Sequence, residues 1–148
     1  MRIHIDQFVN GRPPEVFARA TDIESWPSVI RGIERIEVDT EGPVGVGTRF
    51  TETRIMFKKE ASETMEITAF DPPHSYVVES HSCGADFHTT IRFHPEGDGT
   101  RIEMDMVTTA TTLMAKLRTP VGLLFKGTMR KLIAKDFADI AAAFERDA

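Results

Sequence analysis

The sequence has few of the residues that cross-link a chain or anchor it in a membrane. Cys83 is the only cysteine among 148 residues, so no internal disulfide can form, and we expect a reducing compartment, the cytoplasm. The N-terminal stretch MRIHIDQFVN lacks the apolar run of a signal peptide, and no segment approaches the ~20 apolar residues that span a bilayer. We therefore expect one cytoplasmic domain over residues 1–148 that does not insert stably into membranes.

Positive charge is also scarce. The chain carries 18 Lys and Arg against 23 Asp and Glu, a net charge of −5, and it has no basic stripe that would neutralise a phosphate backbone. This balance predicts no nucleic-acid partner. The segment Gly45–Phe50 lacks the third glycine of a dinucleotide-binding loop and leads into a predicted strand, which excludes that motif.

A metal site is not expected either. His81 and His88 are predicted to face each other across a hairpin close to Cys83, and paired histidines are common zinc ligands. They lie, however, on the polar outer face of the predicted sheet, with no obvious fourth ligand. The sequence therefore predicts neither a metal nor an organic cofactor.

The chain does contain long stretches in which apolar and polar residues alternate, a pattern typical of strands. Ile3, Ile5 and Val9 form a first strand, and two short helices follow, one opened by Pro14 and one by Asp22. After these helices, apolar residues recur at every second position, and turn residues separate the alternating stretches. Six further strands are predicted near 33–39, 45–56, 60–70, 75–82, 87–94 and 100–109. Their short connections indicate antiparallel hairpins.

The end of the chain changes to helical spacing. After a connector over Leu113–Thr119, a long helix is predicted from Pro120 to about Arg146, with an apolar stripe on one side. The polar side of this helix is expected to hold Lys126, Arg130, Lys131, Lys135, Asp136 and Asp139. A twisted seven-stranded sheet curls around such a helix, and one helix of ~10 Å diameter does not fill it. The pattern thus predicts an α+β fold with an apolar pocket between sheet and helix.

The turns also predict which residues face each other. A turn at Gly97-Asp98 sets Arg92 opposite Glu103. The same turn sets Phe93, Ile91 and Thr89 opposite Ile102, Met104 and Met106. A turn at Gly84-Ala85 sets Tyr76, Val78 and His81 opposite Phe93, Ile91 and His88. A turn at Lys58-Lys59 sets Phe50, Glu52 and Arg54 opposite Ile67, Met65 and Glu63.

Several motifs resemble those of the SRPBCC superfamily, also called START-like or birch-pollen-allergen-like. They are Pro14-Glu15-Val16-Phe17-Ala18, Thr21–Pro27, Gly45–Phe50, Asp71-Pro72-Pro73 and Gly99-Thr100, and the resemblance covers essentially the whole chain. It implies a helix-grip fold: a seven-stranded curved antiparallel sheet around a long C-terminal helix, with two short helices between strands 1 and 2. Members bind lipids, polyketides, hormones or other hydrophobic molecules. A minority are cyclases or related enzymes, and no catalytic residue is common to all.

The side chains predicted to line the pocket and bind the ligand come from the inward faces of strands and helix. They are Trp26, Phe50, Met65, Ile67, Tyr76, Val78, Phe87, Ile91, Met104, Met106, Phe125, Met129 and Ile133. Arg54, Glu63 and Tyr76 are the candidates for acid–base chemistry, with Arg54 and Glu63 interpreted as one partly buried ion pair. An ordinary core and a solvated salt bridge remain the alternatives for these residues.

Three functions fit these features. The favoured one is binding of a small hydrophobic ligand, such as a lipid, a polyketide or an aromatic compound, because no nucleophile–base or metal constellation is apparent. The alternative is a polyketide cyclase/dehydrase-type enzyme that uses acid–base residues of the pocket. A second alternative is a protein-interaction module with a closed core. The sequence does not reveal the oligomeric state.

Overall fold

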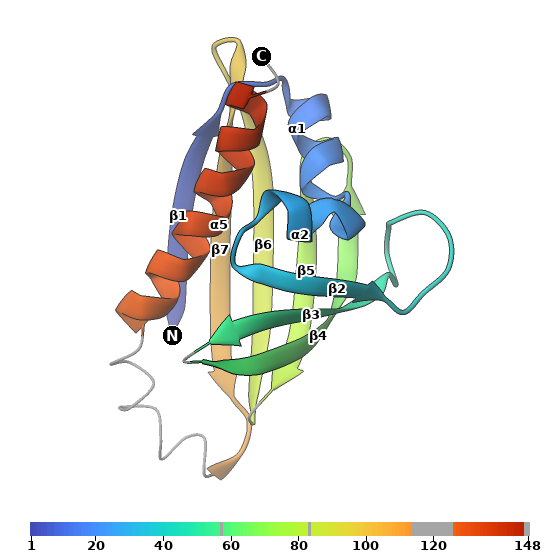
Figure 1. Ribbon diagram of the computed structural model, residues 1–148, viewed down its shortest axis with the longest axis vertical. Helices are drawn as coiled ribbons and strands as arrows, with labels where there is room; N and C mark the ends of the chain where they lie inside the picture. Colours follow the sequence, from blue (N-terminus) through green and yellow to red (C-terminus); the bar gives the residue numbers. More distant parts are fainter. Residues whose placement is uncertain (57, 83, 114–125, 147–148) are drawn as a thin grey trace.

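The computed structural model describes residues 1–56, 58–82, 84–113 and 126–146. Seven strands form a single antiparallel sheet in the order β1-β7-β6-β5-β4-β3-β2, and one long helix lies against it (Figure 1). The strands are β1 (Arg2–Val9), β2 (Ile33–Val38), β3 (Arg49–Met56), β4 (Lys59–Asp71), β5 (Ser75–Ser82), β6 (Ala85–Glu96) and β7 (Gly99–Ala110). This is the predicted helix-grip fold.

Three short helical segments connect β1 to β2. They are α1 (Pro13–Ala20), the 3-10 turn η1 (Ile23–Ser25) and α2 (Trp26–Val29). The predicted second short helix is therefore split in two, since the Ser25 N–H bonds to the Asp22 carbonyl three residues back, while the Ile30 N–H bonds to the Trp26 carbonyl four residues back. Asp22 precedes η1 without a side-chain capping bond.

The long C-terminal helix α5 runs over Lys126–Arg146 in the described part of the chain, about 30 Å at 1.5 Å per residue. Its predicted start at Pro120, most of the predicted connector and Phe125 lie outside the described residues. Within the described ranges, no helix combines the length and apolar character needed to cross a membrane.

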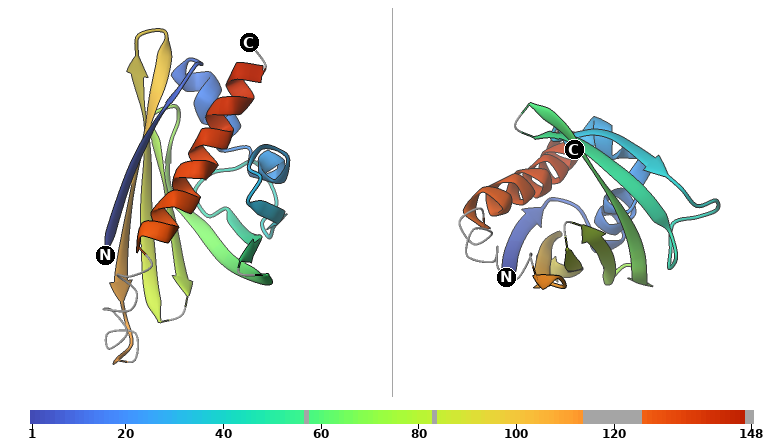
Figure 2. Two further views of the ribbon diagram at one scale, coloured as in Figure 1. Left: turned by 60° about the vertical axis from the view of Figure 1, so that its left-hand side comes forward. Right: turned by 90° about the horizontal axis from the view of Figure 1, so that it is seen from below.

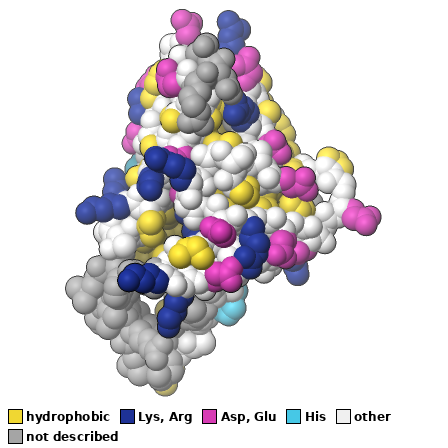
Figure 3. Space-filling view, in the orientation of Figure 1, with side chains coloured by type: hydrophobic (Ala, Val, Ile, Leu, Met, Phe, Trp, Pro, Cys, Tyr) yellow, Lys and Arg dark blue, Asp and Glu magenta, His cyan; other side chains and the backbone are white. Residues whose placement is uncertain are grey.

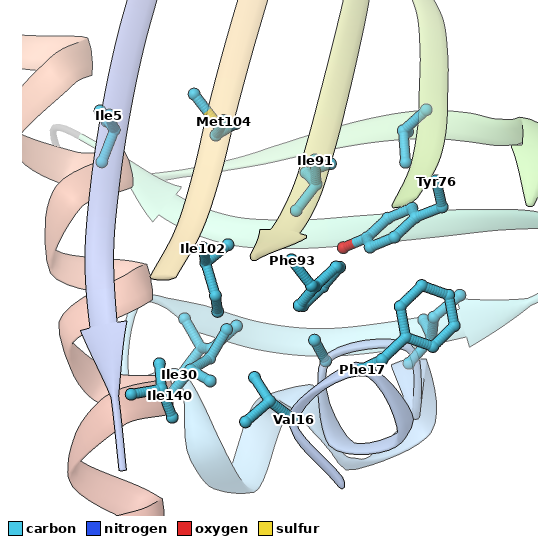
Figure 4. Packing of buried hydrophobic residues seen from close by; sticks show 14 of the residues in the cluster. Ile5, Val16, Phe17, Ile30, Tyr76, Ile91, Phe93, Ile102, Met104 and Ile140 are labelled. Atoms are coloured by element: carbon cyan, nitrogen blue, oxygen red, sulfur yellow. The ribbon is translucent and has the colours of Figure 1, made fainter. Parts of the chain in front are cut away.

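The sheet curls around a central space. Seen from below, β2 and β3 lie opposite β6 and β7, and α5 lies on the concave side together with α1 and α2 (Figure 2). The twist of adjacent strands produces this curl. One end of the space is filled by a packed core around Phe17, whose ring meets those of Phe70 at 5.3 Å and Phe93 at 5.0 Å (Figure 4).

The register of the last hairpin is as predicted. Arg92 pairs with Glu103, Ile91 with Met104 and Thr89 with Met106. The turn glycine Gly97 has a φ of 57°, which glycine adopts without the steric cost that a Cβ brings.

Two other registers differ from the prediction by two residues. Tyr76 pairs with Ile91 rather than Phe93, Val78 with Thr89, and His81 with Asp86 rather than His88. Ser82 already pairs with Ala85, so the turn comes one residue earlier than expected. Cys83 lies outside the described residues.

The β3–β4 hairpin is displaced in the same way. Phe50 pairs with Met65, Glu52 with Glu63 and Arg54 with Ala61. Met56 pairs with Lys59 and Lys58 has a φ of 66°, so this turn is also one residue earlier than predicted. A shift of two residues keeps every side chain on its predicted face, because the side chains of a strand alternate with a period of two.

Candidate functional site

A pocket of about 370 Å³ lies between the sheet, α2 and α5. This volume lies within the ~300–1,000 Å³ that is usual for small-molecule sites. The predicted alternative of a closed core is therefore wrong. Apolar side chains from β3, β4, β5, β6 and β7 form most of the wall, and Met129, Ile133 and Ile140 of α5 face them.

Most of the residues predicted to line the pocket lie on its wall, although their binding of a ligand stays a prediction. These are Trp26, Phe50, Met65, Tyr76, Val78, Phe87, Ile91, Met104, Met106, Met129 and Ile133. Ile67 does not line it and is packed within the core at 1% exposure.

Trp26 is positioned by two contacts. Its indole N–H donates to the Ala20 carbonyl at 3.0 Å, and its ring meets that of Phe50 edge-on at 5.4 Å. Both contacts hold the half-buried indole against the pocket wall.

One end of the pocket carries charge, in a set of four side chains that we call the charged cluster: Glu52, Arg54, Glu63 and Asp136. The predicted pairing of Arg54 with Glu63 is wrong, because the two-residue shift moves Glu63 away from Arg54 and places it opposite Glu52. Arg54 instead forms salt bridges with Glu52 at 2.8 Å and Asp136 at 2.6 Å. Glu63 accepts a hydrogen bond from the Ser80 hydroxyl at 2.7 Å.

Arg54 joins the sheet to the helix. Its Nη1 donates to Asp136 Oδ1 at 3.0 Å and its Nη2 to Asp136 Oδ2 at 2.6 Å, which is a bidentate contact. Its Nε and Nη2 both donate to Glu52 Oε1, at 3.2 and 2.8 Å. The predicted placement of Asp136 on the solvent side of the helix is therefore wrong, and so is that of Asp139, which is buried.

Burial decides the direction of the pKa shift for two carboxyls of this cluster. It raises the pKa of Glu52 and that of Asp136, because the effect of desolvation exceeds the opposing effect of Arg54 on each carboxyl. Burial by itself would lower the pKa of the Arg54 guanidinium, but its hydrogen bonds and its attraction to Asp136 and Glu52 raise it overall. Arg54 is thus a permanent cation and cannot act as a general acid.

Tyr76 lies at the other end of the pocket, with its ring stacked on Phe93 at 6.1 Å (Figure 4). Burial raises the pKa of its hydroxyl. Tyr76 is therefore a neutral phenol at physiological pH, suited to donating a hydrogen bond rather than accepting a proton.

Sequence reasoning missed the roles of Glu52 and Asp136. Both signals were present: Glu52 alternates with Phe50 and Arg54 on the inward face of β3. Asp136 lies three residues after Ile133 and four before Ile140, on the apolar stripe of the helix.

The histidines lie elsewhere. His81 pairs with Asp86 at 2.6 Å, and both side chains are exposed. Among the residues that the structure describes, no three His, Cys, Asp or Glu side chains come together as a metal site.

The curled sheet, the gripped helix and the pocket between them define a helix-grip protein of the START-like class. The chain belongs to the family described as "Polyketide cyclase / dehydrase and lipid transport", whose model matches residues 2–148. No curated protein gives a significant match to the chain.

Solved structures share the fold at low sequence identity. A START superfamily protein from Mycobacterium smegmatis is 11% identical over 99% of both chains, with a TM-score of 0.77. The protein TTHA0849 from Thermus thermophilus is 21% identical over 97% of this chain and 99% of that one, with a TM-score of 0.72. The di-domain ARO/CYC StfQ of the steffimycin biosynthetic pathway is 12% identical over 99% of this chain and 51% of that one, with a TM-score of 0.76.

Proposed function

We propose that this protein binds a small, mainly hydrophobic molecule in the pocket between the sheet and α5. The observation that carries the proposal is the pocket of about 370 Å³, whose wall is formed mostly by aromatic, methionine and aliphatic side chains. Methionine side chains adapt to irregular apolar ligands, and five of them line this space: Met56, Met65, Met104, Met106 and Met129. Burial of the ligand's apolar surface would supply the affinity.

The test is a panel of fatty acids, polyketide-like aromatics and sterols, read by thermal shift and native mass spectrometry. A ligand that binds the folded protein alone, present at about 100 times its Kd, should add about 2.7 kcal/mol to the free energy of unfolding. Absence of both stabilisation and retained mass across the whole panel would contradict the proposal.

A pair of matched variants locates the binding. Thr89 lines the pocket, whereas the side chain of its neighbour Thr90 points to the opposite face of β6. Thr89→Trp should fill the pocket and abolish binding, while Thr90→Trp should leave the affinity within about twofold. Equal affinities of the two variants would show that the ligand binds elsewhere.

A cyclase/dehydrase-type activity is the second candidate. The specific observation in its favour is the carboxyl of Glu52, whose pKa is raised by burial and which lines the pocket beside Glu63. A carboxyl that holds its proton closer to neutral pH is suited to donating that proton to a ketone oxygen as a carbon–carbon bond forms.

The assay uses a linear triketone, whose cyclisation with loss of water gives a dihydroxytoluene that is followed by absorbance and mass. Glu52→Gln and Glu63→Gln should reduce turnover with little change in binding. Turnover that persists in both variants would exclude acid–base catalysis by this pair.

A further inference from the structure

The charged cluster has an excess of acceptors over donors. It contains the three carboxyl groups of Glu52, Glu63 and Asp136 and the single guanidinium of Arg54, all on the wall of the pocket. When all four are ionised, two negative charges remain without a partner inside the cluster. In Figure 3, acidic and basic side chains surround exposed hydrophobic ones on the face that carries α5 and β3.

Arg54 has little capacity left for a ligand. A guanidinium has five N–H donors, and four of them are engaged by Asp136 and Glu52. An anionic ligand group would find one free N–H on Nη1, surrounded by carboxylates. The geometry therefore disfavours a bound carboxylate or phosphate.

Glu52 and Glu63 are directly opposite each other across β3 and β4. Like charges in this arrangement destabilise a sheet, and the side chain of Glu52 is only 13% exposed. Arg54 engages one oxygen of Glu52, and Ser80 donates to one oxygen of Glu63. Oε2 of each carboxyl has no partner among the described residues, so both can accept hydrogen bonds from a donor in the pocket.

A second polar group faces the same space. Tyr76 lines the pocket and is 6% exposed, and its hydroxyl has no hydrogen-bond partner within the described part of the chain. This unpartnered hydroxyl, like the free carboxylate oxygens, is a group whose hydrogen-bonding capacity a ligand would satisfy.

We propose that the pocket selects mainly apolar ligands that carry a protonated amine, and that Glu52 and Glu63 hold this amine. The inference rests on the proposed binding function and specifies the polar group of its ligand. An ammonium has three N–H donors and one positive charge. It would satisfy the free oxygens of both carboxyls and remove their mutual repulsion.

The test compares three ligands with one apolar body: naphthylmethylamine, naphthylmethanol and naphthoate. Their Kd values are measured by calorimetry at neutral pH with the full chain. The amine should bind about tenfold tighter than the carboxylate, since the ammonium donates to Glu52 and Glu63, whereas the anionic carboxylate has no donor and is repelled by them. The alcohol should lie between them, and Thr89→Trp should abolish binding of the amine.

Matched variants assign the preference to residues. Glu63→Gln and Glu52→Gln should each bring the Kd of the amine close to that of the alcohol. Glu79→Gln, the same change on the exposed face of β5, should leave all three values unchanged. An amine preference that survives both pocket variants would overturn the assignment.

The outcomes separate this inference from the binding function. If the alcohol or the carboxylate binds as tightly as the amine, or if none of the three binds while a panel ligand does, the inference is wrong and the binding function stands. If neither the three compounds nor the panel binds, both fail.

Discussion

Arg54 differs from Arg49 in the burial of its ion pairs. It is surrounded by carboxyls inside a pocket wall, whereas Arg49, on the same strand, pairs with Glu66 at the exposed surface, where both side chains are largely hydrated. Buried ion pairs cost much of their attraction in desolvation, so their removal matters mainly through the charges left behind.

Arg54→Met should lower the free energy of unfolding by about 2–3 kcal/mol at pH 7. This is below the ~3–5 kcal/mol of a fully buried pair, because the partners Glu52 and Asp136 retain 13% and 14% exposure. This loss of stability should be smaller at pH 4, where the carboxyls of Glu52 and Asp136, left without Arg54, take up protons. Urea unfolding at both pH values measures it.

The matched control is Arg49→Met, which removes an exposed pair and should cost under about 1 kcal/mol at either pH. Equal losses for the two variants would contradict the burial argument.

The raised pKa of Glu52 predicts how stability depends on pH. The folded state holds this proton more tightly than the unfolded state, so stability decreases as pH rises above the ordinary value of 4.5 towards the raised one. Glu52→Gln, a neutral isostere, should flatten this decrease and be at least as stable as the wild type at pH 7. Unfolding curves between pH 4 and 8 test it, with Glu66→Gln as the exposed control. A steeper decrease in Glu52→Gln would show the opposite shift.

At the scale of elements, α5 is attached to the rest of the molecule by two aspartates one turn apart. Asp136 binds Arg54 of β3, and the buried Asp139 binds Arg31, which lies between α2 and β2. Asp139 accepts from the Arg31 backbone N–H at 3.0 Å and from its guanidinium at 3.1 and 3.3 Å. These two contacts join α5 to β3 and to the segment between α2 and β2.

Asp139→Ala should cost about 2 kcal/mol, because it removes a charged acceptor and leaves the Arg31 N–H without its partner. Arg31→Ala should cost under about 1 kcal/mol, since that side chain is 77% exposed and the backbone bond survives. Chemical denaturation compares the two variants. Hydrogen exchange of the residue 31 amide should accelerate only in Asp139→Ala. Acceleration in both variants would show that the Arg31 guanidinium, rather than its backbone N–H, makes the main contact with Asp139.

At the scale of the whole molecule, the concave side of the sheet is divided into a filled part and an open part. The filled part surrounds α1 and includes Ile102, whereas Ile91 belongs to the wall of the pocket. The same sheet thus serves as a core at one end and as a binding surface at the other.

Ile102→Ala should cost about 3–4 kcal/mol, within the range for a fully packed side chain. Ile91→Ala should cost about 1 kcal/mol less, because one side of Ile91 already faces the pocket. Thermal and urea unfolding measure both variants. Ligand affinity should change for Ile91→Ala alone, and an equal effect of Ile102→Ala would mean that the two regions are not independent.

Much of the fold could be predicted from local pattern. The alternation over residues 33–109 predicted six strands, and the helical spacing near the C-terminus predicted α5. The inward faces of β3 and β5 were predicted correctly although their registers were not, because a shift of two residues preserves the face.

Local pattern was enough for the helix-grip fold and for the apolar character of the concave face, because the period of apolar residues is a local property of the chain. Which charges meet was settled by the folded arrangement instead. Whether Arg54 lies opposite Glu63 or Ala61 depends on a turn that differs by one residue. Its pairing with Asp136 joins residues 82 positions apart, and only the packing of α5 against the sheet brings them together.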